Sequence, residues 1–207
     1  MSLESILLLI SACLAVNLSP GPSVLLVTSI TASYGFKAGI MAVLGMACGA
    51  FIHVLLAATG VAALLQASPL AFTLIQYAGA VYLIYLGVDL LRSPRQEARA
   101  EALKGRSDLW YSFRRGAIVD ALNPKIALFF VAFIPQFLNQ VENPGLLVSI
   151  VLGSVFLLTG VIVNGSIAAL VASGVSRTRG RFSIWVERRF PAAILILLGL
   201  RLLWQEN

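Results

Sequence analysis

Six long apolar runs, separated by short polar segments, constrain what this chain of 207 residues can fold into. A helix of about 20 apolar residues crosses the hydrocarbon core of a bilayer. Only 12% of the residues are charged and the mean hydropathy is +0.92, whereas a soluble domain carries about 25% charged residues. The sequence therefore predicts an all-α integral membrane protein with six transmembrane helices, over Ser5–Thr31, Phe36–Gln66, Pro69–Leu91, Phe113–Leu138, Gly145–Ser173 and Phe190–Trp204.

Lys and Arg are concentrated in two connections between the runs. Residues 92–115 hold seven of them and residues 174–189 hold five, whereas the connections around Ala67 and Asn143 hold none. Because the cytoplasmic loops of membrane proteins carry the excess of Lys and Arg, we expect both basic segments in the cytoplasm and both termini in the periplasm. The net charge of +6 is explained by this topology, so the expected partner is a lipid bilayer and not a nucleic acid.

The two halves of the chain resemble each other. The segment AVYLIYLGVDLLR, Ala80–Arg92, aligns without gaps with AAILILLGLRLLW, Ala192–Trp204, at seven identical positions. When the first run is aligned with the fourth and the second with the fifth, further residues occupy equivalent positions: Pro20 and Pro124, Gly49 and Gly160, and His53 and Asn164. Two units of three spans have opposite orientations, and such inverted repeats are common in secondary transporters. We therefore expect two three-helix repeats, residues 1–92 and 113–207, joined by a basic cytoplasmic linker, residues 93–112.

Prolines interrupt the first and the fourth apolar runs near the middle of the predicted membrane. Ser and Asn are favoured N-cap residues and Pro is favoured at the first helical position, so Ser19-Pro20 and Asn123-Pro124 predict that a new half-helix starts at each site. A helix N-terminus presents free N–H groups and a partial positive charge, which favour a carboxylate. We therefore expect broken first and fourth helices whose starts hold a substrate, with Gly21 allowing close approach to the backbone. A simple proline kink is the alternative.

Four polar side chains inside the predicted spans are candidates for function, because such residues are costly in a membrane. Lys125 is expected to hold a substrate carboxylate together with the helix starts; alternatively, it pairs with Asp120. Asp120 is a candidate proton carrier, or it neutralises a nearby cation. His53 is a second candidate for proton coupling, or it is a hydrogen-bonded packing residue. Asn17 either binds the substrate or satisfies a backbone carbonyl freed by the break.

Three segments of the chain resemble the LysE/RhtB family of bacterial amino-acid exporters. They are SPGPSVLLV from Ser19, YLIYLG from Tyr82 and, as the most specific, NPKIALFFVAFIPQF from Asn123. The resemblance extends along essentially the whole chain. It implies efflux of amino acids or close derivatives across the bacterial inner membrane, driven by the proton gradient. It also implies about six spans and a homodimer.

The same resemblance implies which positions line the substrate site. They are Pro20, Gly21 and Pro22 of the first motif and Asn123, Pro124 and Lys125 of the second. Ser23 departs from the family pattern, because many members have Asp or Asn directly after the PGP. A neutral hydroxyl group there leaves no carboxylate beside the break, which disfavours a cationic substrate. We therefore expect a small neutral amino acid, such as homoserine, threonine or a branched-chain one.

Two other functions are alternatives to secondary export. A membrane thiol–disulfide electron carrier would use Cys13 and Cys48, although neither lies beside the prolines and the sequence has no CxxC motif. A passive channel would have no need for Lys125 at a closed site in mid-membrane. An intramembrane hydrolase is disfavoured, because the sequence contains neither GxSxG nor HExxH. We expect neither enzymatic activity nor a metal ion or other cofactor.

Overall fold

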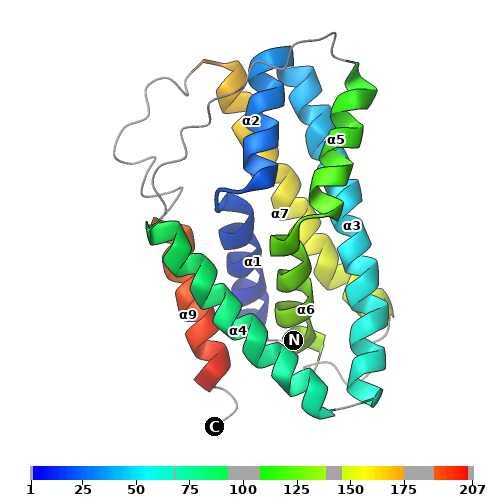
Figure 1. Ribbon diagram of the computed structural model, residues 1–207, viewed down its shortest axis with the longest axis vertical. Helices are drawn as coiled ribbons and strands as arrows, with labels where there is room; N and C mark the ends of the chain where they lie inside the picture. Colours follow the sequence, from blue (N-terminus) through cyan, green and yellow to red (C-terminus); the bar gives the residue numbers. More distant parts are fainter. Residues whose placement is uncertain (1, 68, 93–107, 139–145, 175–188, 205–207) are drawn as a thin grey trace.

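The computed structural model describes residues 2–67, 69–92, 108–138, 146–174 and 189–204, and within these ranges it contains helices and no strands (Figure 1). The expected all-α class is therefore confirmed for the described residues. The greater part of the predicted linker, residues 93–107, and of the second basic segment, residues 175–188, lies outside them. The helices are α1 Leu3–Leu18, α2 Pro22–Tyr34, α3 Phe36–Ala67, α4 Pro69–Arg92, α5 Leu109–Ala121, α6 Pro124–Leu138, α7 Leu146–Ala172 and α9 Phe190–Trp204.

Both proline-containing runs are broken into two helices, as predicted. The axes of α1 and α2 differ by 56°, and those of α5 and α6 differ by 49°. Helices α3 and α7 are each long and apolar enough to cross a membrane, and each bent pair passes the same test when it is taken together. By length and composition, the described residues thus provide two to four membrane spans.

The two breaks start their second helices in different ways. Helix α6 begins at Pro124, and the side-chain Oδ1 of Asn123 accepts a hydrogen bond from the N–H of Lys125 at 3.1 Å, as expected for an N-cap. The prediction that Ser19 and Pro20 start the other helix is wrong. Ser19 instead ends α1 in an extended conformation, which the following proline favours, and α2 begins only at Pro22.

Glycines allow helices α3 and α5 to pack with their backbones in contact. A Cβ atom added to Gly45 would collide with the carbonyl oxygen of Phe113, and one added to Gly116 would collide with that of Ala42. Small residues at such interfaces bring membrane helices close together. Gly35 has a different role: its φ of 84° lies in the left-handed region that favours glycine, and it forms the turn between α2 and α3.

Helices α4 and α9 contact each other through equivalent residues of the two halves. A Cβ atom on Gly87 would approach the carbonyl oxygen of Ala192 at 2.8 Å, and one on Gly199 would approach that of Ala80 at 2.6 Å. The alignment of the two halves pairs Gly87 with Gly199 and Ala80 with Ala192. The contact is therefore reciprocal, and it requires the two helices to run antiparallel.

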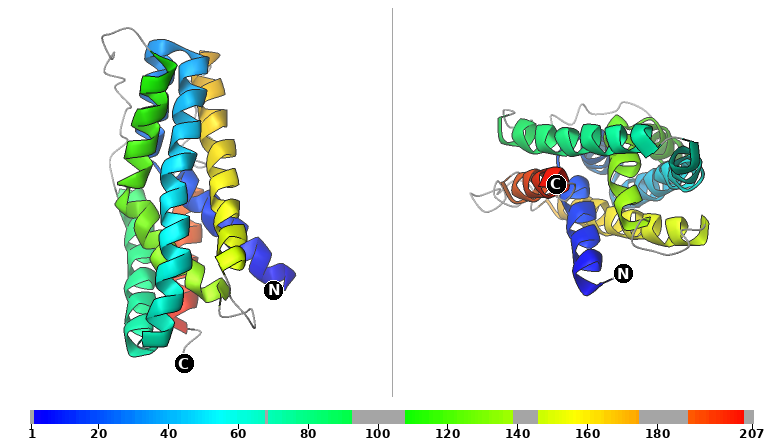
Figure 2. Two further views of the ribbon diagram at one scale, coloured as in Figure 1. Left: turned by 90° about the vertical axis from the view of Figure 1, so that its right-hand side faces the viewer. Right: turned by 90° about the horizontal axis from the view of Figure 1, so that it is seen from below.

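Helix α1 begins and helix α9 ends in the same half of the molecule, as Figures 1 and 2 show. It is the half in which α3 passes to α4, whereas α5 begins and α7 ends at the opposite end. Between these ends, α6 and α7 contribute an aromatic core whose side chains are almost fully buried: Phe129, Phe130, Phe133, Phe137 and Phe156. The two helix breaks lie beside this core, halfway along the molecule.

Candidate functional site

The break between α1 and α2 leaves a backbone carbonyl that the Ser19 hydroxyl and Lys125 both satisfy. In a continuous helix the N–H of residue 20 would bond the carbonyl of Val16, but residue 20 is proline and has no N–H. The Nζ of Lys125 donates instead to this Val16 carbonyl at 3.0 Å, and also to the backbone carbonyl and the Oγ of Ser19, each at 3.0 Å. Cations stabilise helix C-termini, so Lys125 caps α1 from another part of the chain.

This geometry bears on the alternative interpretation of Lys125, and its role in binding a substrate stays a prediction. A lysine ammonium group has three N–H donors, and the three acceptors on α1 match them. The alternative, an ion pair between Lys125 and Asp120, does not form in the described structure, because Lys125 reaches α1 instead. A Cβ atom at position 21 would lie 3.2 Å from the Lys125 Nζ. Gly21 has a φ of 179°, which any residue adopts, so the contribution of glycine there is the space that it leaves for the nearby ammonium group.

The break between α5 and α6 removes the helical partner of a second carbonyl, which now contacts the backbone N–H of Asn123, at 3.2 Å, and His53. Pro124 lacks the N–H that would bond the Asp120 carbonyl, and Nε2 of His53 lies 3.0 Å from that oxygen. A carbonyl oxygen only accepts hydrogen bonds, so Nε2 carries the hydrogen. The imidazole ring also stacks on Phe130, with 6.4 Å between the ring centroids. His53 is thus a hydrogen-bonded packing residue here, and a role in proton coupling stays a prediction.

A buried hydrogen-bond network joins the two breaks. The Oγ of Ser23, in the first turn of α2, donates to Oδ1 of Asp120 at 2.6 Å. The Nδ2 of Asn123 donates to the same Ser23 oxygen at 3.2 Å. All three side chains are buried. The two motifs that the sequence singled out, more than ninety residues apart, therefore meet through Ser23, Asp120 and Asn123.

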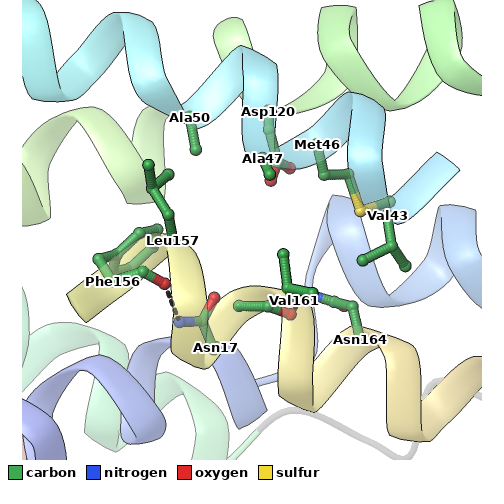
Figure 3. Close-up of a pocket in the computed structure, with 11 residues that line it drawn as sticks. Asn17, Val43, Met46, Ala47, Ala50, Asp120, Phe156, Leu157, Val161 and Asn164 are labelled. Carbon is green, nitrogen blue, oxygen red and sulfur yellow. Dashed lines mark hydrogen bonds between the residues drawn. The ribbon is translucent and has the colours of Figure 1, made fainter. Parts of the chain in front are cut away.

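A small cavity adjoins this network between α1, α3, α5 and α7 (Figure 3). The space open to the centre of a water molecule is about 10 Å³, which is room for about one water molecule. The residues that line the cavity are Asn17, Val43, Met46, Ala47, Ala50, Asp120, Phe156, Leu157, Gly160, Val161 and Asn164. In this conformation the cavity is thus too small for an amino acid.

Two of the predicted site residues, Asn17 and Asp120, line the cavity. Asn17 binds α7, because its Nδ2 donates to Thr159 Oγ1 at 3.1 Å and to the Phe156 carbonyl at 3.3 Å. The Phe156 carbonyl lies on α7 and was not freed by the break between α1 and α2. The interpretation that Asn17 satisfies a carbonyl freed by the break is therefore wrong. The remaining predicted binding residues surround the breaks, and the side chains of the three prolines are exposed: Pro20, Pro22 and Pro124.

Sequence reasoning did not assign Asn164 to the site. The alignment of the two halves pairs Asn164 with His53, and no role was predicted for it beyond that. The available signal was an amide side chain in the middle of an apolar run. The cysteines give no support to a thiol carrier: both are free, Cys13 is buried in the core, and Cys48 is exposed on α3.

Comparison with known proteins identifies the family. The model of the LysE type translocator family matches residues 14–206. The chain belongs to the LysE type translocator family. It is therefore a membrane transporter, and the resemblance drawn from the three sequence segments is confirmed.

Relatives of this translocator are membrane proteins. It is 36% identical to the uncharacterised membrane protein PA4757 of Pseudomonas aeruginosa over 179 residues, which cover 84% of the chain and 79% of the relative. It is 33% identical to the uncharacterised membrane protein YrhP of Bacillus subtilis over 149 residues, which cover 68% of the chain and 71% of the relative. No solved structure matches the chain.

Proposed function

We propose that this translocator is a secondary active exporter of small neutral amino acids or close derivatives across the bacterial inner membrane, in exchange for protons. The observation that carries the proposal is the meeting of both helix breaks at one buried polar network beside a closed cavity. In many secondary transporters, broken helices near the bilayer midplane form the substrate and ion sites at the interface of two repeats.

The proposal includes six spans arranged as an inverted repeat. The reciprocal contact of Gly87 and Gly199, between antiparallel helices, supports this arrangement, and so does the position of the start of α1 and the end of α9 in the same half of the molecule (Figure 1). Six spans and the distribution of Lys and Arg together give the proposed topology. The basic segments, residues 92–115 and 174–189, lie in the cytoplasm and both termini lie in the periplasm. The family resemblance adds a homodimer, which native mass spectrometry of the purified protein would detect.

The substrate carboxylate is proposed to bind at the starts of α2 and α6. The first N–H groups of α2, after Pro22, have no partner within their helix and carry the positive end of its dipole. The ammonium group of Lys125 lies beside Gly21. Its charge therefore adds to that of the α2 terminus while it continues to cap α1. Ser19, Ser23 and Asn123 hold this geometry in place.

Asp120 is the proposed proton carrier. Its carboxyl group is buried, lines the cavity and contacts Ser23 at the start of α2. Intramembrane carboxyl groups of this kind form proton relays in pumps and transporters. A change in the charge of Asp120 would act directly on the hydrogen bond that joins α5 to α2. His53 bonds the backbone of Asp120 and is the second candidate.

The size of the cavity supports a transporter with alternating access over a passive channel, because a space for about one water molecule holds no amino acid. The deciding experiment uses cells that lack their own exporters, express this protein and are fed dipeptides. We expect neutral amino acids to accumulate outside these cells and not outside cells with an empty vector. A protonophore should abolish this difference. No export across the neutral and basic amino acids would contradict the proposal.

A further inference from the structure

An amide oxygen at the cavity has no hydrogen-bond partner. Asn164 is only 4% exposed, and its Oδ1 is unbonded within the described structure. The orientation of the amide is determined, because Nδ2 donates to the Gly160 carbonyl at 3.0 Å and a carbonyl cannot donate. Leaving a buried acceptor unsatisfied costs about 1–3 kcal/mol. The position therefore has a physical reason to bind a donor.

A second amide of the cavity has the same orientation. The Nδ2 of Asn17 is used by Thr159 and the Phe156 carbonyl, so its Oδ1 is the group left for a ligand. A Cβ atom on Gly160 would lie 3.1 Å from this oxygen. Because position 160 has no side chain, the Asn17 oxygen is left uncovered beside the cavity.

Asp120 adds a negative charge to these two acceptors. Its Oδ1 accepts one hydrogen bond from Ser23, and an ionised carboxylate has about four acceptor sites. The three polar side chains come from α1, α5 and α7, and the other lining residues are apolar or glycine (Figure 3). In the described structure, the side chains of the cavity thus offer acceptors and a negative charge, and both amide donors are already used.

We propose that this cavity binds a protonated primary amine, and that it is the subsite for the amino group of the exported substrate. An ammonium group has three N–H donors and one positive charge, which match Asp120, Asn164 and Asn17 in number and in sign. It is also about as large as a water molecule, which is the size of the cavity. The apolar lining excludes a second charged group, so the substrate carboxylate lies outside this cavity.

This inference rests on the proposed function, but its test measures binding and not export. Methylammonium chloride is added to the purified full-length protein in detergent, and thermal unfolding is followed. A ligand that binds the folded state raises the unfolding temperature with its concentration. Tetramethylammonium has the same charge without N–H donors, and sodium is a small cation without them. We expect methylammonium to stabilise the protein and these two controls, at equal ionic strength, to have no effect. An equal effect of sodium or tetramethylammonium would overturn the inference.

Variants of Asn164 assign the binding to the cavity. Asn164→Leu removes the acceptor and should weaken methylammonium binding about tenfold or more, as expected for a lost hydrogen bond to a charged group. Asn164→Asp keeps an acceptor at the same position and should retain binding. Ser154→Ala, also on α7, removes a hydroxyl that bonds the Ile150 carbonyl away from the cavity and should have no effect on binding. Unchanged binding by Asn164→Leu would contradict the site.

The outcomes separate this inference from the proposed function. Amino-acid export without binding of methylammonium would refute the amine subsite and leave the exporter intact. Binding of methylammonium that depends on Asn164, without export of any amino acid, would support the subsite and refute amino-acid export.

Discussion

Replacing Lys125 by Met tests whether this residue holds the break between α1 and α2. Methionine has a side chain of similar length but no N–H donor. The substitution therefore removes the three hydrogen bonds to Val16 and Ser19. The Val16 carbonyl keeps its bond from the Ser19 Oγ, at 2.8 Å, so the Ser19 carbonyl is the buried acceptor that loses its partner. An unsatisfied buried acceptor costs about 1–3 kcal/mol.

The expected loss can be measured as a shift in thermal unfolding in detergent. For chains of this length, about 1 kcal/mol corresponds to about 2–4 °C, so we expect the unfolding temperature of Lys125→Met to fall by about 2–12 °C. Lys37→Met is the matched control, because Lys37 is exposed at the start of α3, and surface substitutions change stability by about 0.5 kcal/mol or less. If Lys125→Met were as stable as the control, Lys125 would not stabilise α1 and the reasoning would be refuted.

Three further substitutions test other parts of the structure. His53→Phe keeps the ring on Phe130 and loses one hydrogen bond to the Asp120 carbonyl, which retains its bond from the Asn123 N–H, so unfolding measurements should show a loss of about 0.5–1.5 kcal/mol; full stability would contradict the role of His53 at the break. Gly116→Val places a side chain against the Ala42 carbonyl, so it should reduce the yield of folded protein by gel filtration, and a normal yield would mean that α3 and α5 do not pack so closely. Asp120→Asn keeps the contact with Ser23 and removes the charge, so export assays should show flux that no longer responds to the proton gradient; unchanged coupling would exclude Asp120 as the proton carrier.

Local signals in the sequence were enough to predict the breaks and one of the two caps. Asn123 followed by Pro124 is an N-cap and a first helical residue, and the structure starts α6 there. The first break has two prolines two residues apart, and each is a possible first residue of a helix. Gly21 precedes Pro22 and is therefore disfavoured in the helical conformation, so a helix cannot run on from Pro20 and starts at Pro22.

The partners of the polar side chains could not be predicted in the same way. Lys125 bonds a carbonyl 109 residues away in the sequence, and His53 bonds one 67 residues away. Each partner depends on which helices lie side by side. The missing N–H of each proline does indicate that a carbonyl four residues earlier needs a donor, but it does not indicate which side chain supplies it. Asn164 was recognisable as a polar residue in a span, whereas its unbonded oxygen depends on the packing around the cavity.

Proton-coupled amino-acid export is tested most directly with the purified protein in liposomes. A radiolabelled neutral amino acid, such as threonine, is supplied at equal concentration on both sides, and a pH gradient is then imposed. We expect the amino acid to accumulate on one side against its own gradient with the native protein, and not to do so with Asp120→Asn. Equilibration at the same rate with and without the pH gradient would contradict the account and would indicate a passive pathway.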